Sequence, residues 1–130
     1  MIEGGCLCDA VRFSVEEFYF GVFKCHCSLC RKAFGGASSA AALCRADRFS
    51  WVQGESTVRQ YQRSSGFLRR FCAHCGSIVP QHLPDFDAFW VPAGLLENAE
   101  SLELRQHIHV DSKAHWERLD ALTRQLPEGF

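Results

Sequence analysis

Residues 72–76 read CAHCG, a pair of cysteines two residues apart that is followed directly by glycine. This spacing is typical of a zinc knuckle, a turn in which both sulfur atoms bind one metal ion. Gly76 favours such a turn because glycine readily adopts a positive φ and lets N–H groups face the sulfurs. One pair supplies two ligands, whereas a closed structural zinc site needs four. The other two must come from elsewhere in the chain.

The motif CLC at residues 6–8 offers the missing pair. In an extended strand Cys6 and Cys8 point to the same face, because side chains alternate with a period of two. Joined to Cys72 and Cys75, they predict a closed four-cysteine zinc site. Such a site would tie the first strand to the middle of the chain.

The motif CHCSLC at residues 25–30 contains three more cysteines, Cys25, Cys27 and Cys30. Three protein ligands and one open position are the pattern of a catalytic zinc. The sequence therefore predicts a second ion, and two Zn²⁺ per chain. His26 and His74 lie inside the motifs and are alternative ligands, but in an extended backbone they would point away from the neighbouring sulfurs.

Eight cysteines are also compatible with a disulfide framework. The first residues, MIEGGCLCDAV, have neither the basic nor the apolar part of a signal peptide. No apolar run approaches the roughly 20 residues of a membrane span. We therefore expect a cytoplasmic protein with reduced thiols, and we interpret the clusters as metal ligands. Cys44, alone in AAALCRAD, is expected to be a buried apolar thiol.

Composition fits one globular domain over residues 1–130, with 47% apolar and 22% charged residues. The formal net charge is −1 and there is no basic run, which argues against nucleic acid as a partner. Exposed strand edges would make a homodimer plausible.

Short alternating or apolar runs, separated by Gly, Ser, Asp or Pro, predict a mainly β domain. The expected strands lie within residues 10–15, 19–23, 38–44, 56–62, 67–72, 77–83 and 87–94. His107 and His109 are expected to share the face of a later strand. In the tail from Asp111 to Leu126, helical spacing of apolar residues indicates a short helix, and an irregular arm that packs Trp116 on the sheet is the alternative.

Five segments together resemble the glutathione-dependent formaldehyde-activating enzyme family, which also includes centromere protein V. They are GGCLCDAVRF (4–13), CHCSLCRKAFG (25–35), YQRSSG through FCAHCGS (61–77), AGLL (93–96) and HIHVDSKAHW (107–116). The resemblance implies a β-tent fold of several coiled sheets with two zinc ions. It also implies the same division of ligands, with Cys6, Cys8, Cys72 and Cys75 structural and Cys25, Cys27 and Cys30 catalytic.

The chain departs from the family pattern at three positions. Asp9 replaces the usual Gly after CLC, and His109 and His115 stand where Phe and Pro are more usual. None of these is a predicted ligand, so the metal assignment is unaffected. We expect them to bear on the substrate if they line a pocket.

The resemblance implies a carbon–sulfur lyase that joins glutathione to formaldehyde and gives S-hydroxymethylglutathione. Arg31 and Lys32 follow the three-cysteine motif and are candidates to bind the thiol substrate, with solvated surface as the alternative. Two other functions stay open: a non-catalytic binding or scaffold module held by two structural zinc ions, and a zinc enzyme that acts on another thiol adduct through bound water.

Overall fold

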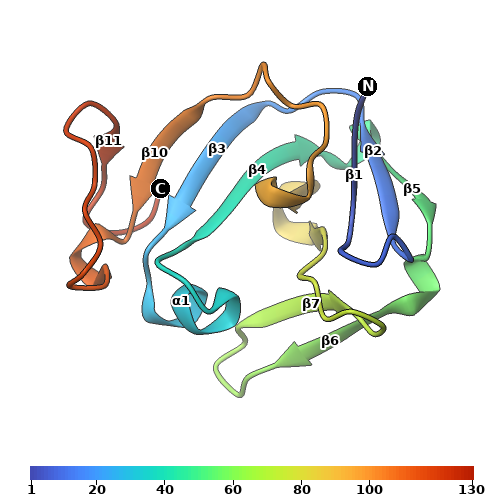
Figure 1. Ribbon diagram of the computed structural model, residues 1–130, viewed down its shortest axis with the longest axis horizontal. Helices are drawn as coiled ribbons and strands as arrows, with labels where there is room; N and C mark the ends of the chain where they lie inside the picture. The colour runs from blue at the N-terminus through green and yellow to red at the C-terminus, as the bar shows by residue number, and fades with distance from the viewer.

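The computed structural model describes residues 1–130 and is mainly β, as the sequence predicted (Figure 1). The strands are β1 (Ile2–Gly5), β2 (Arg12–Val15), β3 (Phe20–Cys25), β4 (Ser39–Arg45), β5 (Phe49–Gln53), β6 (Val58–Gln62), β7 (Leu68–Cys72), β8 (Gln81–Leu83), β9 (Ala88–Pro92), β10 (Leu104–Ile108) and β11 (Arg124–Gln125). Each segment predicted to be a strand contains one. The strands β1, β5 and β11 lie outside the segments predicted to be strands.

The one α-helix is α1 (Ser28–Phe34); it begins within the CHCSLC motif and continues beyond it. The sequence analysis missed it because it has only seven residues and no apolar periodicity of its own. Cys27 begins the helix, since its Sγ accepts the backbone N–H of Cys30 at 3.3 Å. Gly35 ends the helix in a left-handed conformation (φ 66°) that glycine adopts without strain.

Five short 3₁₀ helices connect the strands: η1 (Ala46–Arg48), η2 (Glu55–Thr57), η3 (Pro84–Phe86), η4 (Ala93–Leu95) and η5 (Val110–Ser112). None of the helices has the length and apolar character that crossing a bilayer requires.

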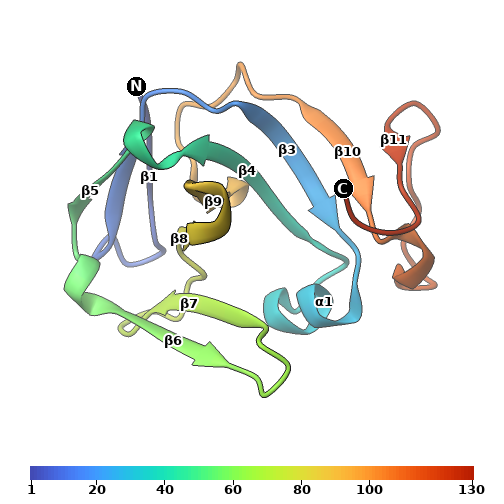
Figure 2. The same ribbon diagram turned by 180° about the vertical axis from the view of Figure 1, so that it is seen from behind.

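The largest sheet has six strands in the order β11-β10-β3-β4-β9-β8 (Figures 1 and 2). Register places Phe23 opposite Ala41 and Leu43 opposite Trp90, so these side chains share one face. That face carries a buried core that also contains Cys25, Cys30 and Ile108. The three-cysteine motif is therefore built on the central strands.

The opposite face of β4 and β9 packs on the three-stranded sheet β1-β2-β5. Cys44 and Val91 from the large sheet join Phe13, Val15 and Phe49 in this second core. Cys44 is fully buried, as the sequence analysis expected.

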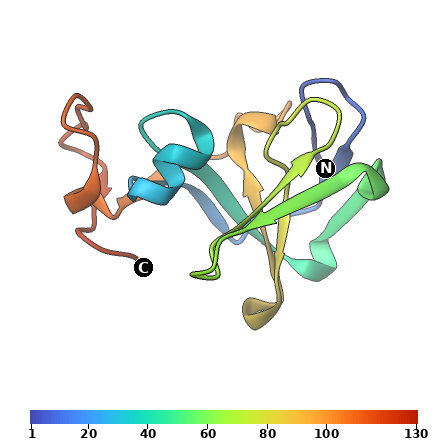
Figure 3. The same cartoon turned by 90° about the horizontal axis from the view of Figure 1, so that it is seen from below.

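The third sheet is the hairpin β6–β7. It lies below the other two sheets in Figure 1, with α1 next to it, and Figure 3 shows the hairpin in front of the sheets from below. A third small core of Cys6, Val11, Cys72 and Val79 lies between the first sheet and this hairpin. The hairpin thus stands between the two cysteine-rich regions.

The tail after β10 is an irregular arm, so the short helix predicted between Asp111 and Leu126 is wrong. After η5 it loops out and returns, and β11 then pairs in parallel with β10. The N–H groups of His109 and Val110 donate to the carbonyls of Glu128 and Leu126, and the N–H of Leu126 donates to the carbonyl of His107. These bonds satisfy backbone groups that a helix would have paired internally. Trp116 is 60% exposed, so it does not pack on the sheet as the arm alternative proposed.

Candidate metal centres

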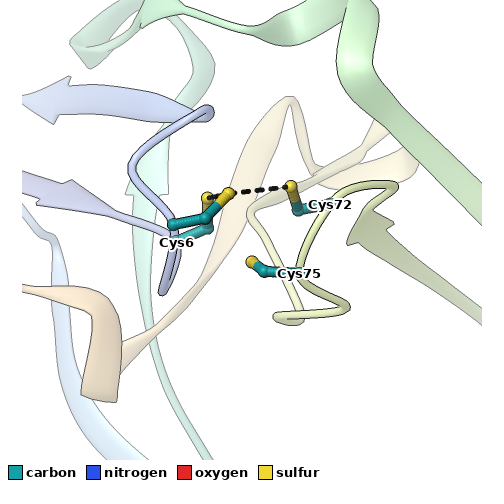
Figure 4. A group of neighbouring side chains, drawn as sticks. Cys6, Cys72 and Cys75 are labelled. Atoms are coloured by element: carbon teal, nitrogen blue, oxygen red, sulfur yellow. Dashed lines mark hydrogen bonds between the residues drawn. The ribbon is translucent and has the colours of Figure 1, made fainter.

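Two turns bring together the four sulfur atoms of Cys6, Cys8, Cys72 and Cys75, all within 4.8 Å of one another. Figure 4 shows Cys6 from the loop after β1 facing Cys72 and Cys75 from the end of β7. Cys6 and Cys8 lie in a turn, not in the extended strand that the sequence analysis assumed. The turn, and not the alternation of side chains along a strand, brings both sulfurs to the cluster.

The spacing of these sulfurs fits a tetrahedral zinc ion. Sγ of Cys8 lies 3.7 Å from Sγ of Cys6 and 3.8 Å from Sγ of Cys72. Four sulfurs at the usual Zn–S distance of about 2.3 Å would be about 3.8 Å apart. All donors are soft thiolates, which favours zinc over harder divalent ions.

Backbone and hydroxyl groups surround this four-cysteine cluster. Val11 N–H donates to Cys6 Sγ at 3.3 Å, and the Ser77 hydroxyl lies 3.3 Å from Cys75 Sγ. Hydrogen bonding by the Ser77 hydroxyl and then by its N–H lowers the pKa of Cys75 to about 5. Gly76 has φ 79°, the conformation expected of a knuckle turn. No Lys or Arg side chain donates to any of the four sulfurs.

The three-cysteine cluster lies where β3 passes into α1. Its sulfur atoms, from Cys25, Cys27 and Cys30, also lie within 4.8 Å of one another. Cys25 and Cys30 are buried and Cys27 is partly exposed. The set offers three soft donors and is reached from the side of Cys27, so it can hold a metal ion with room for one further ligand.

Arg69 on β7 contacts this cluster, and the sequence analysis did not predict it. Its Nη2 donates to Cys30 Sγ at 3.3 Å. The pKa of Cys30 is lowered to about 5, first by a hydrogen bond from the Cys25 thiol, and further by the Ser39 hydroxyl and the positive charge of Arg69. Without a metal ion the proton thus stays on Cys25, whose pKa is raised. No spacing rule links residue 69 to residue 30, because the contact depends on where the hairpin lies.

His26 is not turned toward the sulfurs. It is fully buried, and its Nε2 lies 2.9 Å from Nδ1 of His107 on β10. Burial lowers the pKa of both imidazoles, so the pair is held neutral and one ring donates to the other. The pair joins the end of β3 to β10, and it leaves Cys25 and Cys27 on either side free to face the cluster. His109 follows the strand at φ 55°, so it does not share a strand face with His107.

A cavity of about 290 Å³ opens beside Arg69, between α1 and the hairpin. Its wall is apolar except for three cations, Lys32, Arg63 and Arg69; the other lining residues are Leu29, Ala33, Tyr61, Phe67, Phe71 and Ile78. Of the two predicted substrate residues, Lys32 thus lines this cavity and Arg31 does not. Arg31 lines a shallower depression beside Trp116, to which Lys32 also contributes.

The comparisons with known proteins agree with this geometry. The family model described as glutathione-dependent formaldehyde-activating enzyme matches residues 1–112. The chain belongs to this family. The match includes both cysteine clusters and Arg69.

Two relatives extend the comparison. A protein of Halomonas elongata, named "Putative glutathione-dependent formaldehyde-activating enzyme", is 30% identical over 134 residues, which cover 93% of this chain and 82% of the relative. A crystal structure of a Rhodobacter sphaeroides protein superposes with a TM-score of 0.61 at 26% identity, covering 75% of this chain and 90% of the other.

The three departures from the family pattern lie away from the cavity. Asp9 has φ 64°, a left-handed conformation that glycine takes freely and aspartate tolerates, which explains why Gly suits that position. His109 is also left-handed, and His115 is exposed in the arm. None of them is among the lining residues of the cavity.

Proposed function

We propose that this chain adds a small anionic thiol, with glutathione as the family's substrate, to formaldehyde or another small aldehyde. The observation that carries the proposal is the juxtaposition of two features. A three-cysteine cluster with one partly exposed thiol is connected through Arg69 to a cavity whose only charged lining residues are cations. Arg69 belongs to both features, since it lines the cavity and contacts Cys30.

The cavity suits a thiol with carboxylates remote from its sulfur. Its volume of about 290 Å³ is near the lower end of ligand cavities, roughly 300 Å³. Lys32 from α1 and Arg63 from the hairpin place positive charge on its wall, where carboxylates can pair with them. The apolar rings of Tyr61 and Phe67 would cover the methylene groups between the charges.

The reaction is a balanced addition with no change of oxidation state. A bond forms between sulfur and the carbonyl carbon, and the thiol proton is transferred to the carbonyl oxygen. Zn²⁺ held by Cys25, Cys27 and Cys30 would lower the pKa of the thiol and polarise the carbonyl. The cavity would hold the thiol in one orientation and exclude water from one side of it. Cleavage of the same carbon–sulfur bond is the lyase direction.

A thiol-and-aldehyde screen on zinc-loaded protein tests the proposal. The rate of adduct formation from ¹³C-formaldehyde and glutathione is followed by NMR against the spontaneous rate. Cys27→Ser is expected to return the rate to the spontaneous one while the far-UV circular dichroism is preserved. The matched control is Cys44→Ser, which removes a thiol that lies outside both clusters.

Two outcomes would count against the proposal. Catalysis that survives Cys27→Ser would not be chemistry of the three-cysteine cluster. If no thiol or aldehyde reacts and both metal ions resist exchange equally, the scaffold alternative is favoured, because neither cluster would then have an exchangeable position.

A further inference from the structure

Contacts from three sides hold the guanidinium of Arg69 in place. Nη2 donates to Cys30 Sγ at 3.3 Å, and Nη1 donates to the carbonyl of Leu68 at 2.8 Å. The group also lies over two aromatic rings, 4.3 Å from the centroid of Phe67 and 4.6 Å from that of Trp90. Both rings attract the cation through their π faces, so the position of the guanidinium is strongly determined.

No carboxylate neutralises this guanidinium. The protein's ion pairs of arginine involve Arg12, Arg45 and Arg48, and none involves Arg69. Nε of Arg69 is also buried away from solvent. A half-buried cation without a counter-charge is unfavourable, so a thiolate is the expected partner. The nearest one is Cys30.

We propose that Arg69 is a positioning residue that offsets the negative charge of the three-cysteine cluster and so lets the cluster accept an anionic thiol. Three thiolates on a divalent ion carry one net negative charge, and a fourth thiolate makes the total two. A fixed cation at hydrogen-bond distance from Cys30 makes that second negative charge less unfavourable. The four-cysteine cluster, which is complete, has no such cation.

The inference rests on the proposed function only in assuming that a thiol is the exchangeable ligand, so its test uses thiol binding without aldehyde. Arg69→Met keeps a long apolar stem between Phe67 and Trp90 and removes the charge. Arg69→Lys restores the charge without the planar group. Arg70→Met is the matched control, since Arg70 points to the other face of β7 and does not line the cavity.

Binding is followed on the cobalt-substituted protein through the sulfur-to-cobalt charge-transfer band. We expect Arg69→Met to weaken thiol binding roughly 10- to 100-fold, the usual effect of losing an outer-shell partner of a metal site. Arg69→Lys should recover part of that loss, and Arg70→Met should bind as the natural protein does. Before thiol is added, the band itself should move in Arg69→Met and not in Arg70→Met, because only Arg69 donates to a ligand sulfur.

The choice of thiol separates this role from simple pairing with the substrate's carboxylates. Arg69→Met should weaken glutathione and the uncharged 2-mercaptoethanol by similar factors. A loss confined to glutathione would overturn the inference and make Arg69 a carboxylate-binding residue. Equal binding by Arg69→Met and the natural protein, or no thiol binding by either, would also overturn it. Thiol binding that depends on Arg69 but leads to no reaction with aldehydes would defeat only the proposed function.

Discussion

The two cysteine clusters use the same donor atom in different surroundings. Sulfurs of the four-cysteine cluster come from two turns, and their neighbours are backbone N–H groups and the Ser77 hydroxyl. Those of the three-cysteine cluster come from the end of a central strand and the start of α1, beside Arg69 and a cationic cavity. On this difference rests our proposal that the first cluster holds the fold together and that the second exchanges a ligand.

Loss of a ligand should have its largest effect at the four-cysteine cluster. Cys72→Ser leaves a buried core between the first sheet and the hairpin without its metal link. Structural zinc contributes about 10–16 kcal/mol of binding free energy, comparable with the whole stability of a domain, about 5–15 kcal/mol. We expect Cys72→Ser to lose cooperative thermal unfolding in calorimetry.

The matched variant is Cys27→Ser, which should unfold cooperatively with a Tm lowered by only a few degrees. If the two variants unfold alike, the assignment of a structural role to one cluster alone is wrong.

Chelation should distinguish the clusters by rate. Metal analysis is expected to give two zinc ions per chain, and a mild chelator should remove one of them at least about tenfold faster than the other, because one cluster has a ligand fewer. Loss of catalysis should follow the faster step, and loss of circular dichroism the slower one. A single rate for both ions would remove the distinction, and one ion per chain would contradict the two-cluster interpretation.

Two neighbouring cations of α1 test whether the cavity binds the thiol. Lys32 lines it and Arg31 does not. We expect Lys32→Ala to raise the KM for glutathione about 3- to 10-fold, the equivalent of roughly 0.7–1.4 kcal/mol. Arg31→Ala should leave KM unchanged. The reverse result would move the substrate to the depression beside Trp116.

The smallest effect is expected at Cys44, the cysteine of neither cluster. Burial raises its pKa to about 12, so almost no thiolate forms at pH 8 in the folded protein. It should therefore resist alkylation until the chain unfolds, as followed by mass spectrometry. Cys44→Ala should lower the free energy of unfolding by about 1–2 kcal/mol and leave the zinc content unchanged. A fall in zinc content would show that Cys44 participates in a metal site.

Local spacing in the sequence was enough to predict which cysteines gather together. Cys72 and Cys75 lie in one turn, as do Cys6 and Cys8, and β3 leads directly into α1. The cysteines of each motif are therefore close in space because they are close in the sequence. The strands were recovered for the same reason, because alternation is a local pattern. The predicted tail helix was wrong because pairing of β11 with β10 outweighed weak helical spacing.

What local patterns could not provide is the environment of the three-cysteine cluster. In FLRRFC, Arg69 resembles an exposed strand residue, and only the placement of the hairpin against α1 brings it to Cys30. The cavity likewise combines residues from α1, β6 and β7. Lys32, proposed as a residue that binds the thiol because it follows directly on the motif, lines this cavity, whereas Arg63 and Arg69 are remote from the motif in sequence.

The short strand β7 has a consequence for oxidation. It carries Arg69 and, three residues later, Cys72, so one strand serves both clusters. Cys8, a partner of Cys72, is the exposed thiol of the four-cysteine cluster, so peroxide can reach it from solvent. Oxidation of Cys8 would release the end of β7 and with it the guanidinium beside Cys30. The protein would then lose the proposed thiol binding through damage at the other cluster, and a thiol reductant would restore it.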